Sequence, residues 1–205
     1  LGAFGIKGLK LNVTGDANDY VGKGLSGATI VVKPPTESNL VSDENTIIGN
    51  TVLYGATSGK LFAAGQSGER FAVRNSGAEA IIEGCDSNGC EYMTGGCVVI
   101  LGKVGDNFAA GMTGGMAFIY DPFREFENYV NPSSVIWQTP ETDYWKNYLK
   151  NLINEHFNET QSQIAQKILL NFNNEIQNFR QVCPNEMLDK LLNPLTLKTK
   201  ISKVV

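Results

Sequence analysis

Glycine is absent from the last ninety residues of this 205-residue chain. All 22 glycines lie between Gly2 and Gly115. Because glycine lacks a Cβ, it is the usual residue where a chain turns with a positive φ angle, and it weakens helix and strand interiors. The absence therefore predicts two parts of different construction. We place the boundary after Asp121, which gives a glycine-rich part, residues 1–121, and a glycine-free part, residues 122–205.

Long apolar runs and a basic excess are also missing. No stretch approaches the roughly 20 apolar residues that span a bilayer, and no signal peptide opens the chain. The chain carries 17 basic and 21 acidic residues, a net charge of −4, so it has no basic field to attract a nucleic-acid backbone. We expect a cytoplasmic protein that binds neither membranes nor nucleic acid. Because Leu1 is not methionine and the repeat is already under way at Gly8, we also expect a piece of a longer polypeptide.

Histidine and cysteine are scarce, which restricts the chemistry. The single histidine, His156, lies in a helical pattern beside apolar residues, so we expect it to be packed or half-exposed and not a catalytic base. Cys85, Cys90 and Cys97 are five and seven residues apart, unlike the two-residue gaps of zinc sites. Together with Cys183 they are predicted to be ordinary buried thiols. An iron–sulfur cluster is the alternative, and disulfides are not expected without a secretory signal.

The glycines that are present recur at a nearly fixed period. Gly59, Gly77, Gly95 and Gly114 are 18, 18 and 19 residues apart. A turn glycine followed by a strand at a fixed period is typical of a stacked, repeating architecture. Short runs rich in strand-forming residues follow these glycines and Gly27, namely Thr29 to Val32, Leu61 to Ala64, Ala80 to Ile82, Val98 to Leu101 and Ala117 to Tyr120.

We therefore predict a right-handed parallel β-helix, whose coils stack about 4.8 Å apart. An antiparallel sandwich is the alternative, but its strands recur every 8 to 12 residues or so. The turn glycines, Gly95 and Gly114 among them, are expected to have positive φ. Between Gly27 and Gly59 we predict a full coil with an exposed excursion at residues 34–45. The apolar residues expected to form interior columns are Ile30 to Val32, Phe71 to Val73, Ile81, Val98 to Ile100 and Phe118 to Tyr120.

Two motifs suggest ligand binding but fit turns better. Residues 22–27 match G-x-G-x-x-G, but a β-branched run and Pro34-Pro35 follow, where a dinucleotide fold needs a helix. Residues 16–19 resemble the start of a calcium loop, but Val21 and Gly27 stand where that loop requires glycine and glutamate. We predict turn glycines at the first motif and Asx turns at the second.

A carbohydrate-cleaving β-helix would need carboxylates or a basic residue that converge on one face. The candidates show no common phase in the repeat, so we predict no catalytic, cofactor-binding or metal-binding residue in this chain. The candidates are Asp16, Asp19, Glu69, Arg70, Arg74, Glu83 and Asp106.

The glycine-free part is predicted to be a connecting segment, residues 122–140, followed by amphipathic helices. Residues 139–141 indicate the start of a first helix, residues 160–163 form a capping-box pattern for a second, and residues 187–192 form a short third. Residues 195–205 are expected to be a loose end. We expect the helices to cap the solenoid at its side or end; a docking surface for another domain is the alternative. The apolar stripes are Trp145, Tyr148, Leu149, Leu152 and Ile153, then Ile164, Ile168, Phe172, Ile176 and Phe179.

Five long blocks carry a family resemblance. They are residues 15–27, which read GDANDYVGKGLSG, and residues 49–59, 68–78, 90–96 and 107–115. Together they resemble the C-terminal, GXGXG-type domain of the large (alpha) subunit of glutamate synthase. The tail also resembles that family's C-terminal helical extension.

The resemblance implies a fold and a function. Glutamate synthase makes two glutamates from glutamine and 2-oxoglutarate, with electrons from a nicotinamide cofactor or ferredoxin. In the family, an N-terminal cysteine hydrolyses glutamine, and ammonia travels to a barrel domain that holds FMN and a 3Fe–4S cluster. The resemblance places those elements outside this chain and implies a right-handed β-helix without known catalytic residues.

We therefore predict a non-catalytic structural domain that holds the amidotransferase and synthase domains of the same enzyme in register. The fold also resembles one of the subunits of formylmethanofuran dehydrogenase, which is a scaffold and not a catalyst. The alternative is therefore a stand-alone β-helix scaffold or interaction subunit of a multi-subunit oxidoreductase.

Overall fold

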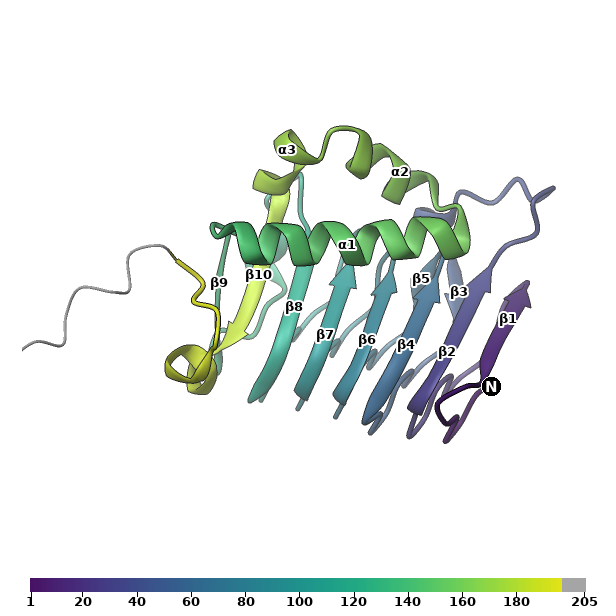
Figure 1. The fold of residues 1–205 in the computed structure, drawn as a ribbon, viewed down its shortest axis with the longest axis horizontal. Coiled ribbons are helices and arrows are strands. Elements are labelled where there is room, and N and C mark those ends of the chain that lie inside the picture. Colours follow the sequence, from purple (N-terminus) through teal and green to yellow (C-terminus); the bar gives the residue numbers. More distant parts are fainter. Residues whose placement is uncertain (197–205) are drawn as a thin grey trace, which may run out of the picture.

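The computed structural model describes residues 1–196, and most of them wind into a stacked parallel sheet (Figure 1). Each coil returns the chain to the same sheet one strand further along, so that residues 18 to 32 positions apart lie side by side. The predicted fold class is confirmed: the chain is a parallel β-solenoid followed by helices towards its C-terminal end. The parallel strands, in order, are β1 (Lys10–Thr14), β2 (Ser26–Lys33), β4 (Ser58–Ala63), β6 (Ser76–Ile82), β7 (Thr94–Ile100) and β8 (Gly114–Tyr120).

A second, smaller sheet forms where the chain returns from its longest excursion. β3 (Thr46–Ile48) pairs in parallel with β5 (Gln66–Ser67). The predicted excursion at residues 34–45 precedes β3 and ends in a 3₁₀ helix at Ser42–Glu44. Ala17 and Cys85 extend this sheet through isolated parallel bridges to Ile48 and Ser67.

Alternate residues of the large sheet point into the solenoid or away from it, because side chains alternate along a strand. Our prediction of the interior columns was half right, since Ile81 and Phe118 lie on the outer face. The interior column consists of Leu11, Ile30, Leu61, Ala80, Val98 and Ala117, and the outer column of Val31, Phe62, Ile81, Val99 and Phe118. The outer face is therefore apolar as well and must be covered.

Each coil turns at a corner of five residues with an unusual backbone. In every corner the first, third and fifth residues have positive φ, as at Tyr20, Gly22 and Gly24. Many of these positions are not glycine, and Thr51 and Leu53 are examples. The equivalent corners span residues 20–24, 51–55, 70–74, 88–92 and 107–111.

The expectation of positive φ at Gly95 and Gly114 was wrong, since neither residue is among those with positive φ. Both are needed for a different reason. A Cβ at Gly95 would overlap the carbonyl oxygen of Ser76, and a Cβ at Gly114 that of Thr94. The repeating glycine therefore lets one coil pass close to the backbone of the coil before it.

Helix α1 (Asp143–Thr160) lies across the outer face of the sheet (Figure 1). The predicted stripe is confirmed, because Trp145, Leu149, Leu152 and Ile153 are buried against that face. The helix begins after Thr142, slightly later than the predicted start at residues 139–141.

The second predicted helix is interrupted. α2 (Gln163–Leu170) begins after Ser162, whose hydroxyl accepts a hydrogen bond from the Ala165 N–H at 3.1 Å. The short α3 (Phe172–Glu175) and a 3₁₀ turn at Ile176–Asn178 follow. Phe179, predicted on that helix, begins β10 (Phe179–Pro184) instead.

Strand β10 pairs antiparallel with β8 on one side and with β9 (Val135–Gln138) on the other. The pairing satisfies the free edge of β8, which an open solenoid end would expose. The third predicted helix is a 3₁₀ helix at Asn185–Lys190. Helices therefore cover the side of the solenoid, and strands close its last coil.

The predicted boundary after Asp121 stays a prediction, since β10 from the second part joins the sheet of the first. The expected loose end was wrong for Leu195, which is buried. Residues 197–205 lie outside the described residues.

Candidate functional site

The groups considered as catalytic candidates are spread over several coils and do not converge on one site. Arg70 pairs with Glu91 at 3.6 Å. The Arg74 guanidinium donates a hydrogen bond to the Tyr54 hydroxyl at 3.2 Å. Asp16, Glu69 and Asp106 are exposed, and Glu83 is buried beneath α1.

The acidic turn at residues 16–19 forms hydrogen bonds to the next coil. Oδ1 of Asp19 accepts the Asn50 N–H of the next coil at 2.8 Å. Oδ1 of Asn50 accepts the Glu69 N–H of the coil after that, also at 2.8 Å. These Asx contacts join neighbouring coils, and the G-x-G-x-x-G glycines lie at a corner that leads into β2, as predicted.

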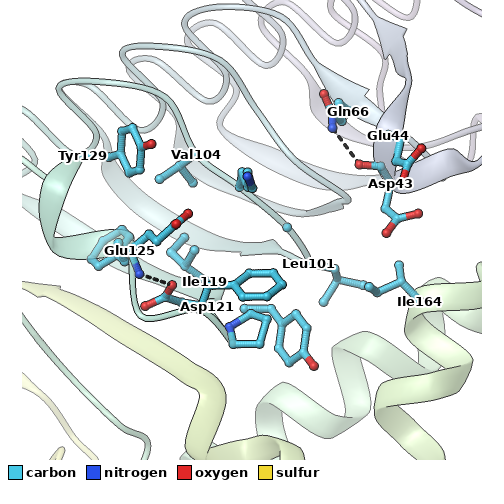
Figure 2. A pocket seen from close by; sticks show the side chains of 16 residues that line it. Asp43, Glu44, Gln66, Leu101, Val104, Ile119, Asp121, Glu125, Tyr129 and Ile164 are labelled. Atoms are coloured by element: carbon cyan, nitrogen blue, oxygen red, sulfur yellow. Dashed lines mark hydrogen bonds between the residues drawn. The ribbon is translucent and has the colours of Figure 1, made fainter.

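A cleft of about 490 Å³ opens between the excursion and the last coil (Figure 2). Its floor is apolar, with Leu101, Ile119 and Ile164, and Asp43 and Glu44 stand at its acidic rim. The Gln66 side chain donates to the Asp43 carbonyl at 2.6 Å, which holds the excursion against the solenoid. No histidine, cysteine or serine lines this cleft among the residues that the structure describes.

A fully buried polar pair lies between the sheet and α1. Nε2 of His156 is 3.3 Å from Oε1 of Glu83, and neither side chain is exposed to solvent. Phe62 stacks on the imidazole with ring centroids 6.2 Å apart. The His156 side chain is therefore packed, as expected, and has no contact with solvent through which it could act on a substrate.

A second set of polar contacts joins α1 to the strands. The Lys60 ammonium lies 2.6 Å from Glu155 and 3.2 Å from Glu79. Burial alone would lower the pKa of Lys60, but the two carboxylates raise it on balance through hydrogen bonds and charge. Tyr148 donates to Glu79 at 2.6 Å, so these charged groups hold the helix in place.

The four cysteines are free and buried. Cys85 and Cys90 lie in the solenoid interior, whereas Cys97 and Cys183 lie beneath α1. Burial raises the pKa of Cys85 to about 12 and that of Cys183 to about 11. Within residues 1–196, no three His, Cys, Asp or Glu side chains are grouped to hold a metal ion. These thiols do not fit the ligand set of a 3Fe–4S cluster.

Sequence analysis missed one surface, which the corners form. Tyr54, Arg74 and Tyr92 occupy neighbouring positions of successive corners, and two more exposed aromatic side chains, Phe4 and Tyr20, lie at the first two coils. The signal in the sequence was their recurrence at the period of the coils. This recurrence was overlooked because the turn positions with positive φ were expected to be glycines.

Comparison with known proteins identifies the family. The GXGXG motif family matches residues 1–185, which is most of the chain. The chain belongs to the GXGXG motif family. None of the helices among the described residues has the length and apolar character that crossing a bilayer would take.

Similar proteins are large chains of glutamate synthase. The chain is 63% identical over 98% of its length to the glutamate synthase (NADPH) large chain of Azospirillum brasilense. It is 49% identical over 90% of its length to the glutamate synthase (NADH) of Schizosaccharomyces pombe and 46% identical over 89% to the large chain of Bacillus subtilis. The chain spans only 9 to 13% of the length of these relatives. It therefore corresponds to one domain of a much larger enzyme.

Proposed function

We propose that this chain is the C-terminal, non-catalytic scaffold domain of a glutamate synthase large chain. The parent enzyme would make two L-glutamates from L-glutamine and 2-oxoglutarate with reducing equivalents. The observation that carries the proposal is the 63% identity, over nearly the whole chain, to a 13% portion of the Azospirillum enzyme.

The architecture supports a scaffold role. Neighbouring coils are joined by backbone hydrogen bonds at the corners, for example from Thr51 to Glu69 at 2.8 Å. α1 joins several coils at once, through Lys10 of β1 and Lys60 of β4. A surface this rigid suits an enzyme in which ammonia passes between two sites, because such a path tolerates little misalignment.

The proposal assigns chemistry and partners to the rest of the enzyme. FMN and the 3Fe–4S cluster would be held outside this chain, and the domains held in register would be the amidotransferase and synthase domains. We place the enzyme in the cytoplasm and expect it to bind neither nucleic acid nor membranes. The prediction that this chain contributes no catalytic, cofactor-binding or metal-binding residue is part of the proposal.

The size of the native polypeptide tests the proposal. An immunoblot of source-organism lysate, with an antibody against this chain, should detect a band many times larger than a 205-residue protein. A band at the size of the chain itself would overturn the proposal and favour the stand-alone scaffold protein. The purified chain should also show no FMN absorbance and no glutaminase activity, and either signal would contradict a non-catalytic role.

A further inference from the structure

We infer that the corners of the solenoid form a docking ridge for an acidic segment of another domain of the same synthase polypeptide. This inference rests on the proposed function and specifies which surface of the chain meets the rest of the enzyme. We define the corner ridge as Phe4, Tyr20, Lys23, Tyr54, Arg70, Arg74 and Tyr92.

The ridge is built on a regular backbone column. Each coil contributes one residue to this column. Backbone hydrogen bonds connect the coils along it; for example, the Arg74 N–H donates to the Glu91 carbonyl at 3.0 Å. All members have positive φ. The column consists of Phe4, Gly24, Gly55, Arg74, Tyr92 and Gly111.

Large side chains in the column lie over glycines of the next coil. A Cβ at Gly24 would come within 2.6 Å of the Phe4 ring, and a Cβ at Gly111 within 2.6 Å of the Tyr92 ring. The rings of Phe4 and Tyr92 therefore pack against the backbone of the next coil, in the space that a side chain there would fill. Side chains that are fixed before binding lose little conformational entropy when a partner docks.

These rings are nevertheless exposed. Phe4 is 68% exposed, Tyr92 56% and Tyr20 50%. Aromatic residues and arginine are enriched in protein interfaces and supply most of their hot spots. Two other surfaces of the solenoid are covered, because α1 lies on its outer face and β10 pairs with its last parallel strand.

The charges on the ridge indicate the chemistry of the partner. The Lys23 ammonium lies 5.5 Å from the centre of the Tyr20 ring, and the Arg74 guanidinium 5.8 Å from that of Tyr54. Neither cation forms a salt bridge with any residue that the structure describes. Lys23 and Arg74 thus each lie over an aromatic ring and have no carboxylate partner among the described residues. A segment that carries carboxylates between apolar side chains would complement them, because its carboxylates can pair with the cations and its apolar side chains can pack on the rings.

The occupant is a domain of the same polypeptide because the relatives contain this chain as a small part of one long chain. Most of the Azospirillum large chain lies outside the 13% that matches. A covalently linked domain docks at high effective concentration. A ridge of a few side chains therefore suffices for stable contact.

Side-chain footprinting of the full-length synthase gives a direct test. Hydroxyl radicals oxidise exposed aromatic side chains, and the rate for each peptide is normalised to that of the denatured enzyme. Phe4, Tyr20 and Tyr92 should react as slowly as the buried Phe108. Reaction at the rate expected of free side chains would overturn the inference, as would protection that disappears on dilution, which would indicate a second copy of the enzyme.

Glycine substitutions separate docking from folding. Arg74 and Tyr92 have φ of 56° and 53°, where glycine is comfortable, so Arg74→Gly and Tyr92→Gly remove the side chains without straining the solenoid. In the full-length enzyme, each should raise the glutamine hydrolysed per 2-oxoglutarate consumed by about threefold while FMN content and glutaminase rate stay unchanged. Arg124→Gly is the matched control, because Arg124 is exposed at φ 60° outside the ridge.

Charge reversal tests the acidic partner. Arg74→Glu should uncouple the enzyme more strongly than Arg74→Gly, because it adds repulsion to the lost contact. Equal effects of the two variants would overturn the assignment of an acidic segment. A wild-type enzyme without glutamate synthase activity would refute the proposed function itself, whereas an active wild type with an accessible ridge would refute only this inference.

Discussion

Nε2 of His156 lies 3.3 Å from Oε1 of Glu83 in a site where both side chains are fully buried. The second polar atom of each side chain, Nδ1 of His156 and Oε2 of Glu83, has no hydrogen-bond partner among the described residues. The pair fixes the position of α1 on the sheet at a cost in desolvation. Removal of one partner therefore leaves the other buried without compensation.

We predict that His156→Leu lowers the free energy of unfolding by about 3 kcal/mol, because it strands the Glu83 carboxylate. Glu83→Met should cost about 2 kcal/mol, because it leaves the His156 imidazole buried without its hydrogen-bond partner. The double variant should lie within about 1 kcal/mol of the wild type. Urea unfolding of all three variants measures this, with Lys10→Met as a control for a partly exposed ion pair. Additive single effects would contradict the account.

Close approach between coils predicts the result of glycine substitution. Gly95→Ala should lower the free energy of unfolding by about 3 kcal/mol, because its Cβ overlaps the Ser76 carbonyl. Gly55→Ala should cost only about 1 kcal/mol, since Gly55 has φ 64° but open space around its Cβ position. Thermal or urea unfolding compares the two, and an equal cost would show that φ, not space, decides.

Strain at the corners predicts a stabilising change. Thr51 is β-branched yet has φ 57°, a conformation that such residues rarely adopt. Thr51→Gly should raise the free energy of unfolding by about 0.5 kcal/mol, since the relief of strain exceeds the entropy that glycine adds to the unfolded chain. Thr29→Gly, in the middle of β2, should instead cost about 1 kcal/mol. A loss of stability at both positions would argue against strain at the corner.

The buried thiols predict a loss of stability at alkaline pH. Burial raises the pKa of Cys85 from 9.0 to about 12, so the unfolded chain releases this proton first as the pH rises. The stability contributed by the protonated thiol is therefore full below pH 9.0 and is lost between pH 9.0 and about 12. Unfolding measured across this range should show a smaller decline for Cys85→Ala than for wild type. An identical decline would mean that this thiol is not the titrating group.

Much of the solenoid could be predicted because a glycine recurs at one position of each coil, where neighbouring coils come close together. The repeating glycines recur where one coil passes close to the backbone of another, and they lie at the start of β6, β7 and β8, with the predicted strand residues after them. The physical reason was misassigned at Gly95 and Gly114, because sequence alone does not distinguish a positive φ from a lack of space. Phe179 was placed on a helix because a stripe of apolar residues continued in phase, but the open edge of β8 required a strand there.

The corner ridge was missed despite the recurrence of its residues, because its backbone contradicts local preference. Alternating residues at Arg70, Ala72 and Arg74 have positive φ although none is glycine, and backbone hydrogen bonds within the corner and to neighbouring coils stabilise that conformation. The contact of the buried Glu83 was likewise not predicted, since Glu83 was considered only among scattered charged residues that were not expected to be catalytic. Its partner on α1, His156, is 73 positions away in the chain, so no local sequence pattern could predict this contact.

The proposed scaffold role makes its most direct prediction about coupling in the full-length synthase. Gly95→Val should distort the solenoid while the amidotransferase and the flavin-containing domain remain folded. Glutamine hydrolysis should then continue while glutamate formation from 2-oxoglutarate falls, so that the ratio of glutamine hydrolysed to 2-oxoglutarate consumed rises well above that of the wild type. A ratio equal to that of the wild type, in a variant whose solenoid is shown by proteolysis to be disrupted, would contradict the scaffold account.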